Sequence, residues 1–98
     1  MKPLEFEWDP AKAAANKRKH RVSFEEARTA FLDEQGLVMA DPEHSEEEDR
    51  FVLLGLSGSL RVLIVCHCYR RNDAVIRIIS ARKANGAERA QYEESRGP

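Results

Sequence analysis

The 98-residue sequence has no long hydrophobic run. Its longest nearly apolar stretch covers residues 62–68, far short of the roughly 20 residues that a membrane-spanning helix needs, so we expect no membrane segment. Residues 1–5 lack the apolar core of a signal peptide, and we therefore expect a cytoplasmic protein. A chain of this length can build one hydrophobic core, which predicts a single domain over residues 1–98.

Cysteine is scarce, and its placement argues against both a disulfide and a metal site. Cys66 and Cys68 lie two residues apart, so on a strand they share one face and are too splayed to close an easy disulfide. His67 between them points the opposite way, and the spacing differs from that of common zinc sites. The acidic residues 41–49 lack the glycine and the regular aspartate spacing of a calcium loop. We predict no metal and no cofactor.

Basic residues are missing from the middle of the chain. Residues 33–49 contain eight acidic and no basic side chains, whereas the net charge of the whole chain is only −1. The C-terminal half is correspondingly basic. A polyanion could therefore bind a local basic face in spite of the nearly neutral total.

The hydrophobic pattern predicts an α+β fold. Capping signals at Asp9, Ser23 and Asn85 indicate helices over residues 10–20, 24–32 and 86–95. Alternating apolar residues indicate strands at 5–8, 37–40, 51–56, 60–69 and 74–81. We expect the helices to cover one face of a mainly antiparallel sheet of about four strands and to leave the other face at least partly open.

Two strands carry the residue types that phosphate chemistry needs. Alternation in the strand at residues 60–69 separates a more apolar set, expected beneath the helices, from a set with Arg61 and His67, expected on the open face. Arg77 interrupts the next apolar strand, and Arg82 and Lys83 extend the positive charge beyond it. Cleavage of RNA without a metal requires proton transfers, which suit histidine, and charge neutralisation, which suits arginine. The spacing alone equally fits a solvated edge with long basic side chains.

Three further residues have two interpretations each. Lys19 and His20 either complement the dipole at the end of the first helix or form a second basic element of the active face. Tyr92 on the last helix either packs into the core or supplies a hydroxyl to an active site.

Separated motifs occur in a characteristic order along most of the chain. They are Phe6-Glu7-Trp8-Asp9-Pro10-Ala11-Lys12, Asn16-Lys17-Arg18-Lys19-His20, Val22-Ser23-Phe24-Glu25-Glu26-Ala27, Asp41-Pro42-Glu43-His44-Ser45, Arg50-Phe51-Val52-Leu53-Leu54-Gly55, Arg77-Ile78-Ile79-Ser80-Ala81-Arg82-Lys83-Ala84, Glu88-Arg89 and Tyr92-Glu93. This series resembles the BrnT family of bacterial type II toxin-antitoxin toxins. The sequence departs from the family pattern at Arg21, Cys68 and Gly86, which implies weaker RNA affinity or lower activity.

The resemblance implies a compact RelE-like fold and a metal-independent endoribonuclease that cleaves RNA and inhibits translation and growth. It also implies neutralisation by a BrnA-type antitoxin with a ribbon-helix-helix part, through which the complex contacts DNA and represses its own operon. The expected catalytic residues are Arg77, Arg82, His67 and His20, and the expected RNA-binding residues are Lys19, Lys83, Arg61 and Tyr92. The alternative is a non-catalytic RNA- or protein-binding module that acts as partner or corepressor of a ribbon-helix-helix DNA-binding protein.

Overall fold

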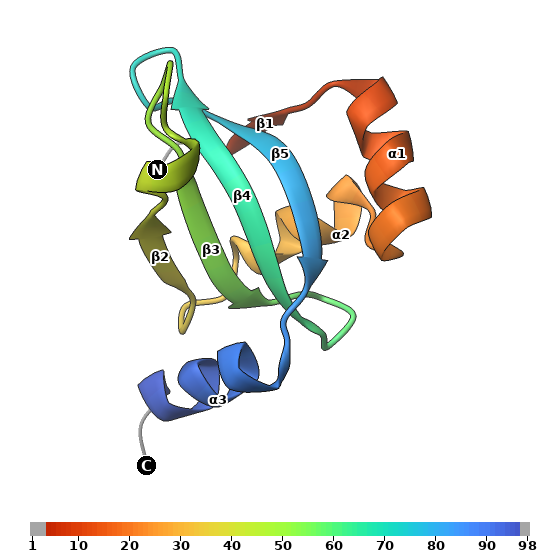
Figure 1. Ribbon diagram of the computed structural model, residues 1–98, viewed down its shortest axis with the longest axis vertical. Coiled ribbons are helices and arrows are strands. Elements are labelled where there is room, and N and C mark those ends of the chain that lie inside the picture. Colours follow the sequence, from red (N-terminus) through yellow and green to blue (C-terminus); the bar gives the residue numbers. More distant parts are fainter. Residues whose placement is uncertain (1–3, 97–98) are drawn as a thin grey trace.

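The computed structural model describes residues 4–96 and confirms the α+β class. Its elements, in chain order, are β1 (Glu5–Glu7), α1 (Pro10–His20), α2 (Phe24–Ala30), β2 (Leu37–Ala40), the short 3₁₀ helix η1 (Pro42–His44), β3 (Phe51–Leu56), β4 (Val62–Arg70), β5 (Val75–Lys83) and α3 (Gly86–Ser95). The strands form one sheet in the order β1-β5-β4-β3-β2 (Figure 1). The sheet has five strands instead of about four because the short β1 pairs with β5, in parallel, while all other pairs are antiparallel.

The predicted capping residues begin the helices. The Asp9 carboxylate accepts from the Ala11 amide at 2.8 Å before α1, and the Ser23 hydroxyl accepts from the Glu26 amide at 3.0 Å before α2. At α3, Asn85 and Glu88 bond each other's backbone amides in a complete capping box. The Glu26 side chain does not reach back in the same way before α2, because it bonds the side chains of Ser57 and Arg61 in the β3–β4 turn.

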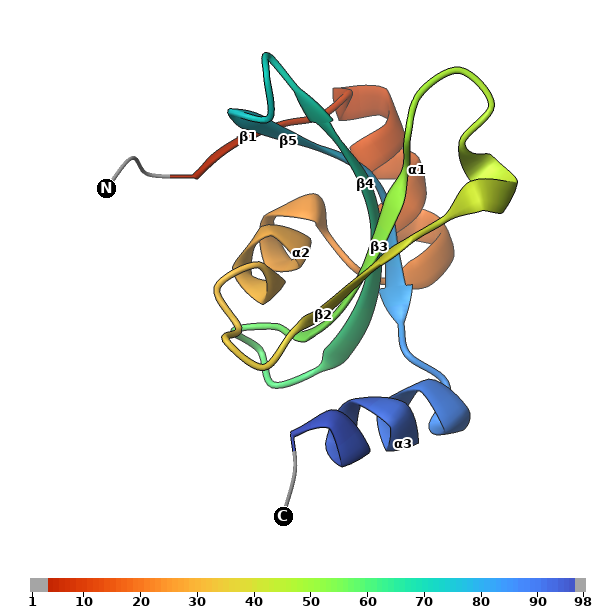
Figure 2. The same cartoon turned by 90° about the vertical axis from the view of Figure 1, so that its left-hand side faces the viewer.

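The face of β4 that packs beneath the helices is the reverse of the one expected. Leu63 and Val65 are fully buried and belong to one cluster with Phe24 and Ala27 of α2. Figure 2 shows α2 on the hollow side of the curved sheet. The expectation was wrong because both faces of β4 are apolar, so that hydrophobicity alone does not distinguish them.

The second face of β4 is apolar because α3 covers one end of it. Tyr92 of α3 is fully buried and forms a smaller cluster with Leu54 and Ala84, against which Val62 and Ile64 also pack. The expectation that all three helices cover one face of the sheet was therefore wrong. Beyond α3 the second face is half-exposed, and we call this part the open face, defined by Val52, Ile64, Cys66, Arg77, Ser80 and Arg82.

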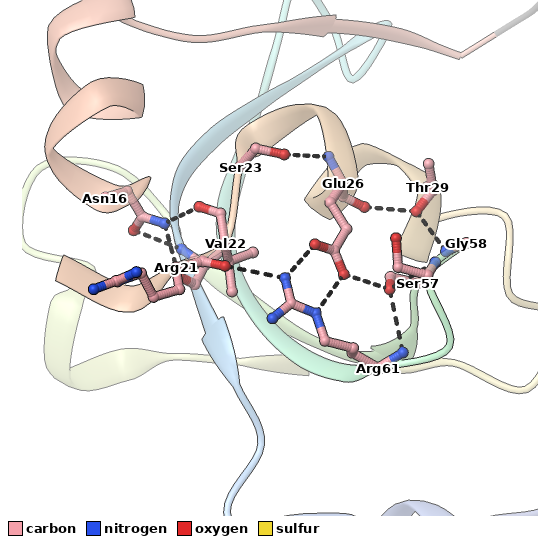
Figure 3. Close-up of polar contacts among 11 residues, drawn as sticks. Asn16, Arg21, Val22, Ser23, Glu26, Thr29, Ser57, Gly58 and Arg61 are labelled. Atoms are coloured by element: carbon pink, nitrogen blue, oxygen red, sulfur yellow. Dashed lines mark hydrogen bonds and ion pairs between the residues drawn. The ribbon is translucent and has the colours of Figure 1, made fainter. Parts of the chain in front are cut away.

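A side chain completes the edge of β5 beyond the point where β1 ends. Asn16 of α1 donates to the Ala81 carbonyl at 2.8 Å and accepts from the Ala81 amide at 3.0 Å. Its amide nitrogen also donates to the Val22 carbonyl at 2.9 Å (Figure 3). Asn16 is buried, and it thus supplies the hydrogen bonds that a neighbouring strand would otherwise provide.

Candidate functional site

A register shift brings the polar residues of β5 onto one face. Cys66 pairs with Ser80, but the next residue, His67, pairs with Ile78, so Ile79 has no partner in the β4 ladder. Regular alternation would put Arg77 and Arg82 on opposite faces because they are five residues apart. The extra residue shifts the alternation by one position, so Arg77, Ser80 and Arg82 all lie on the open face. Their partners on β4 are Cys68, Cys66 and Ile64, respectively.

Arg82 is held in place by a carboxylate of α3. Its two terminal nitrogens donate to the two oxygens of Glu88 at 2.8 and 2.9 Å. This pairing raises the pKa of Arg82 and lowers the pKa of Glu88. Arg82 and Glu88 also line a hollow of about 240 Å³, together with Met39, Ala40, Asp41, Val52, Leu54, Ile64 and Gln91. A fixed guanidinium at the side of a shallow hollow is suited to a phosphate group.

Arg77 has a comparable partner on the neighbouring strand. Glu7 of β1 lies directly opposite Arg77, and the guanidinium donates to its carboxylate at 2.6 Å. Both side chains are about one-third exposed. Arg77 therefore remains within reach of a ligand, and a phosphate would share it with Glu7.

Arg61 is part of a structural network on the other side of the molecule. Its side chain forms a two-pronged ion pair with Glu26, which also accepts from the Ser57 hydroxyl at 2.7 Å (Figure 3). The hydrogen bond from Arg61 lowers the pKa of Glu26. Arg61 also donates to the backbone carbonyl of Arg21 at 3.1 Å. These contacts tie the β3–β4 turn to α2 and use most of the donors that RNA would need.

His67 does not reach the surface, contrary to the expectation that it faces outward from the open face. Its side chain is fully buried, with the ring edge-on to Phe31 and Tyr69. Nδ1 lies 3.0 Å from the Val65 carbonyl, which can only accept, so Nδ1 carries the proton and Nε2 accepts from the Tyr69 hydroxyl at 3.3 Å. Burial lowers the pKa of His67. The ring is therefore a neutral member of the core.

Tyr92 is likewise a packing residue. Its hydroxyl donates to the Asp33 carboxylate at 2.5 Å, and Asp33 also accepts from the Leu56 amide at 2.9 Å. Burial, reinforced by the bond to Asp33, raises the pKa of Tyr92 to about 12. Tyr92 thus fastens α3 to the sheet, and its hydroxyl is not available to a ligand.

The end of α1 forms a second basic surface, separate from the open face. Lys17, Arg18 and Arg21 line a hollow of about 400 Å³, and Lys19 is exposed beside them, with His20 half-buried. The exposed Lys83 lies two residues beyond Ala81, the residue that Asn16 of α1 bonds. Lys19 and His20 end the helix that contacts β5, Lys83 ends β5 itself, and Arg77 lies six residues before Lys83 on that strand.

The acidic segment contains an ordered polar frame that the sequence interpretation missed. The Asp41 amide donates to the Arg50 carbonyl at 2.8 Å, and the Arg50 amide donates to the Ser45 hydroxyl at 2.9 Å. The Ser45 hydroxyl in turn donates to the Asp41 carbonyl at 2.6 Å. Within this frame, His44 Nδ1 lies 2.9 Å from an Asp41 carboxylate oxygen. The aspartate–histidine spacing was a usable signal, but the surrounding charge run made a solvated loop the simpler interpretation.

The two cysteines are free and lie on the second sheet face, not beneath α2. Burial raises the pKa of both thiols, so both are protonated at neutral pH. Among residues 4–96, no group of three or more His, Cys, Asp or Glu side chains is arranged to hold a metal ion. No helix in the same range has the length and apolar content needed to cross a membrane.

A family model matches most of the chain. Residues 8–88 match the model of a family described as the ribonuclease toxin BrnT of type II toxin-antitoxin systems. The matched range includes every element from α1 to β5 and ends within α3. No curated protein shows a significant match.

Proposed function

The chain belongs to the BrnT family of type II toxin-antitoxin ribonuclease toxins, and we propose that it is an endoribonuclease that cleaves RNA without a metal ion, with the open face as its substrate-binding surface. The observation that carries this proposal is the placement of Arg77 and Arg82 on that face by the register shift in β5. Cleavage of cytoplasmic RNA by this surface would inhibit translation and growth.

The roles of the two arginines follow from their contacts. The bidentate pair with Glu88 fixes Arg82 but leaves its Nε–H without a partner among residues 4–96, so Arg82 can still donate to a phosphate. Arg77 sits at the opposite end of the same strand face. Arg77 and Arg82 lie five positions apart on one strand, a separation of roughly 15 Å. They therefore suit two separated phosphates of a single strand, each guanidinium neutralising the phosphate that it contacts.

The basic end of α1 is proposed to bind RNA outside the cleavage site. Lys19, His20 and Lys83 combine with the neighbouring Lys17, Arg18 and Arg21 to give a positive surface without a salt-bridge partner among residues 4–96. Such a surface attracts the phosphate backbone irrespective of sequence. We do not assign Arg61, Tyr92 or His67 to the RNA site, because Arg61 is tied to Glu26 and the other two are buried.

The type II family implies an antitoxin protein as partner. We propose a BrnA-type antitoxin with a ribbon-helix-helix part, and we propose that the complex represses its own operon, with DNA contacts made by the antitoxin. An antitoxin acidic segment that displaces RNA from Arg77 and Arg82 would account for neutralisation.

The experiment that tests the activity is incubation of the purified full chain with total RNA in excess EDTA, followed by analysis of the fragment ends. A parallel reaction uses ribosomes programmed with messenger RNA in magnesium buffer. Fragments that carry 5′-hydroxyl ends are expected from the wild type, because transesterification releases the 5′ oxygen. Arg82→Ala should cleave at least tenfold more slowly.

The matched control is Lys12→Ala, which removes one exposed positive charge from the first turn of α1. It should retain wild-type cleavage, and thermal melts should show that both variants are folded. Activity that disappears in EDTA and returns with a divalent ion would contradict the metal-free mechanism. Intact RNA in both reactions, with folded protein, would contradict the ribonuclease assignment.

One observation favours a second candidate function. Arg61, Arg77 and Arg82 each bond a carboxylate of the chain itself. Such pairing weakens the attraction for a phosphate and fits a module that binds RNA or an acidic protein without cleaving it. Tight binding of an antitoxin by a folded protein that leaves RNA intact would support this alternative.

A further inference from the structure

The proposed reaction needs a group that accepts a proton, and the chain contains three histidines. His67 is fully buried, and its ring proton is committed to the Val65 carbonyl. His20 has no hydrogen-bond partner in its side chain among residues 4–96, so nothing there fixes its ring. His44 differs from both, because its side chain is 63% exposed and one ring nitrogen is held by a carboxylate.

The contact with Asp41 determines which nitrogen of His44 is free. An ionised carboxylate only accepts, so the 2.9 Å contact places a proton on Nδ1 and leaves the lone pair of neutral histidine on Nε2. The Asp41 side chain is itself only 18% exposed, whereas the contact is open to solvent on the side of His44. This is the arrangement in which a carboxylate orients an imidazole that acts as a base.

Arg50 has no ion-pair partner among residues 4–96 and shares a hollow with His44. Arg50 and His44 line the same hollow, about 260 Å³ in volume. The Nε–H of Arg50 is buried and has no hydrogen-bond partner among the residues described. An unsatisfied buried donor is costly unless water or another polar group completes it. The Arg50 carbonyl accepts from the Asp41 amide at 2.8 Å, and Asp41 lines the hollow beside Arg82, so Arg50 lies close to the open face.

The backbone joins these groups into one unit that adjoins the open face. The hydrogen bonds of Asp41, Ser45 and Arg50 close the two ends of the segment onto each other. Asp41 also lines the hollow that contains Arg82. The His44–Asp41 pair therefore stands at the border between the two hollows.

We propose that His44 is the general base of RNA cleavage, that Asp41 positions it, and that Arg50 binds the scissile phosphate; this inference rests on the proposed ribonuclease function. His44 Nε2 takes the proton of the 2′-hydroxyl, and O2′ forms a bond to phosphorus. The bond from phosphorus to O5′ breaks, and O5′ takes a proton from water. The imidazolium returns its proton to the resulting hydroxide, so the products are a 2′,3′-cyclic phosphate and a 5′-hydroxyl end.

The carboxylates around His44 restrict which RNA can bind at this site. Glu43, Glu46, Glu47 and Glu48 line the same hollow and repel a polyanion. Binding must therefore come from Arg50 and from the arginines of β5. We therefore expect single-stranded RNA, which can contact His44 locally, to bind better than a duplex, which would lie along the whole acidic segment.

The test compares His44→Ala, His20→Ala and the wild type in the reaction, free RNA or ribosomes, that shows cleavage. His44→Ala should cleave about 10²–10⁴-fold more slowly, the usual contribution of a general base. Added imidazole should restore part of this activity, which a purely structural role would not allow. Asp41→Asn should lower kcat with little change in KM, and imidazole should not rescue it. Lys12→Ala, at an exposed position of α1, serves as control and should cleave as fast as the wild type.

The outcomes separate this inference from the ribonuclease assignment. Wild-type rates for His44→Ala would overturn the role of His44 and leave the activity standing, and loss of activity in His20→Ala alone would transfer that role to His20. Absence of cleavage by the wild type in both reactions would overturn both proposals. A folded His44→Ala variant that is inactive and rescued by imidazole would establish the base.

Discussion

Asn16 gives the sharpest prediction about stability. Asn16→Ala removes the partners of three buried backbone groups: the amide and carbonyl of Ala81 and the carbonyl of Val22. A buried polar group that loses its partner costs about 1–3 kcal/mol, and water entering the small cavity offsets part of this. We expect the free energy of unfolding to fall by about 3 kcal/mol, which for a domain of this size lowers the Tm by about 12–24 °C.

Urea unfolding and thermal melts would measure the loss, and a second variant identifies its cause. Asn16→Leu restores most of the volume but none of the hydrogen bonds, so it should be destabilised nearly as much as the alanine variant. Lys12→Ala, at an exposed position of the same helix, should change stability by less than about 0.5 kcal/mol. Hydrogen exchange should show faster exchange of the Ala81 amide in both Asn16 variants.

Two results would refute this reasoning. If Asn16→Leu were as stable as the wild type, packing and not hydrogen bonding would explain the residue. If Asn16→Ala left the exchange of the Ala81 amide unchanged, the edge of β5 would not depend on this side chain. Since β5 carries Arg77 and Arg82, we also expect the Asn16 variants to cleave RNA more slowly, even below their melting temperatures.

Three other outcomes are expected. Glu26→Ala should lower the free energy of unfolding by about 1–3 kcal/mol in urea melts, more than Glu25→Ala, because it removes the partner of Arg61. The pKa of Glu26 is lowered in the fold, so its contribution to stability is present above pH 4.5 and is lost as the pH falls through the pKa of the folded state. Tyr92→Phe should cost about 1 kcal/mol and remove the tyrosine that titrates near pH 12 in ultraviolet absorbance. Burial lowers the pKa of His67 below 6.5, so the unfolded chain binds the proton at a higher pH than the folded chain does. The wild type should therefore lose stability between pH 7 and pH 5. A plot of stability against pH with the same slope for His67→Gln would contradict this.

Local signals in the sequence predict most of the secondary structure but not how its parts meet. Asp9, Ser23 and Asn85 cap the predicted helices because capping depends on residues three or four apart. Leu63 and Val65 were assigned to the wrong face because α3 and α2 both need an apolar surface on β4. Nothing local in the sequence indicates which helix covers which surface.

The candidate site shows the same division. Arg77 and Arg82 were identified from their charge within an apolar strand, but their common face depends on the extra residue at Ile79, which no pattern in the sequence marks. His67 was placed outside by alternation alone, and its burial follows from the position of α2. His44 and Asp41 were set aside because their acidic neighbours suggested a solvated loop, whereas the hydrogen bonds to Ser45 and Arg50 give that segment a fixed shape.

The closure of the β5 edge by one amide also bears on solubility. A strand edge with unpaired amides and carbonyls is a template for pairing with another chain, and proteins usually block it with a strand, a charge or a proline. Here a single asparagine does so, at Ala81, where the sheet has no further strand. Substitution of Asn16 would therefore leave the edge of β5 unpaired as well as destabilise the fold. We expect such variants to aggregate as they unfold.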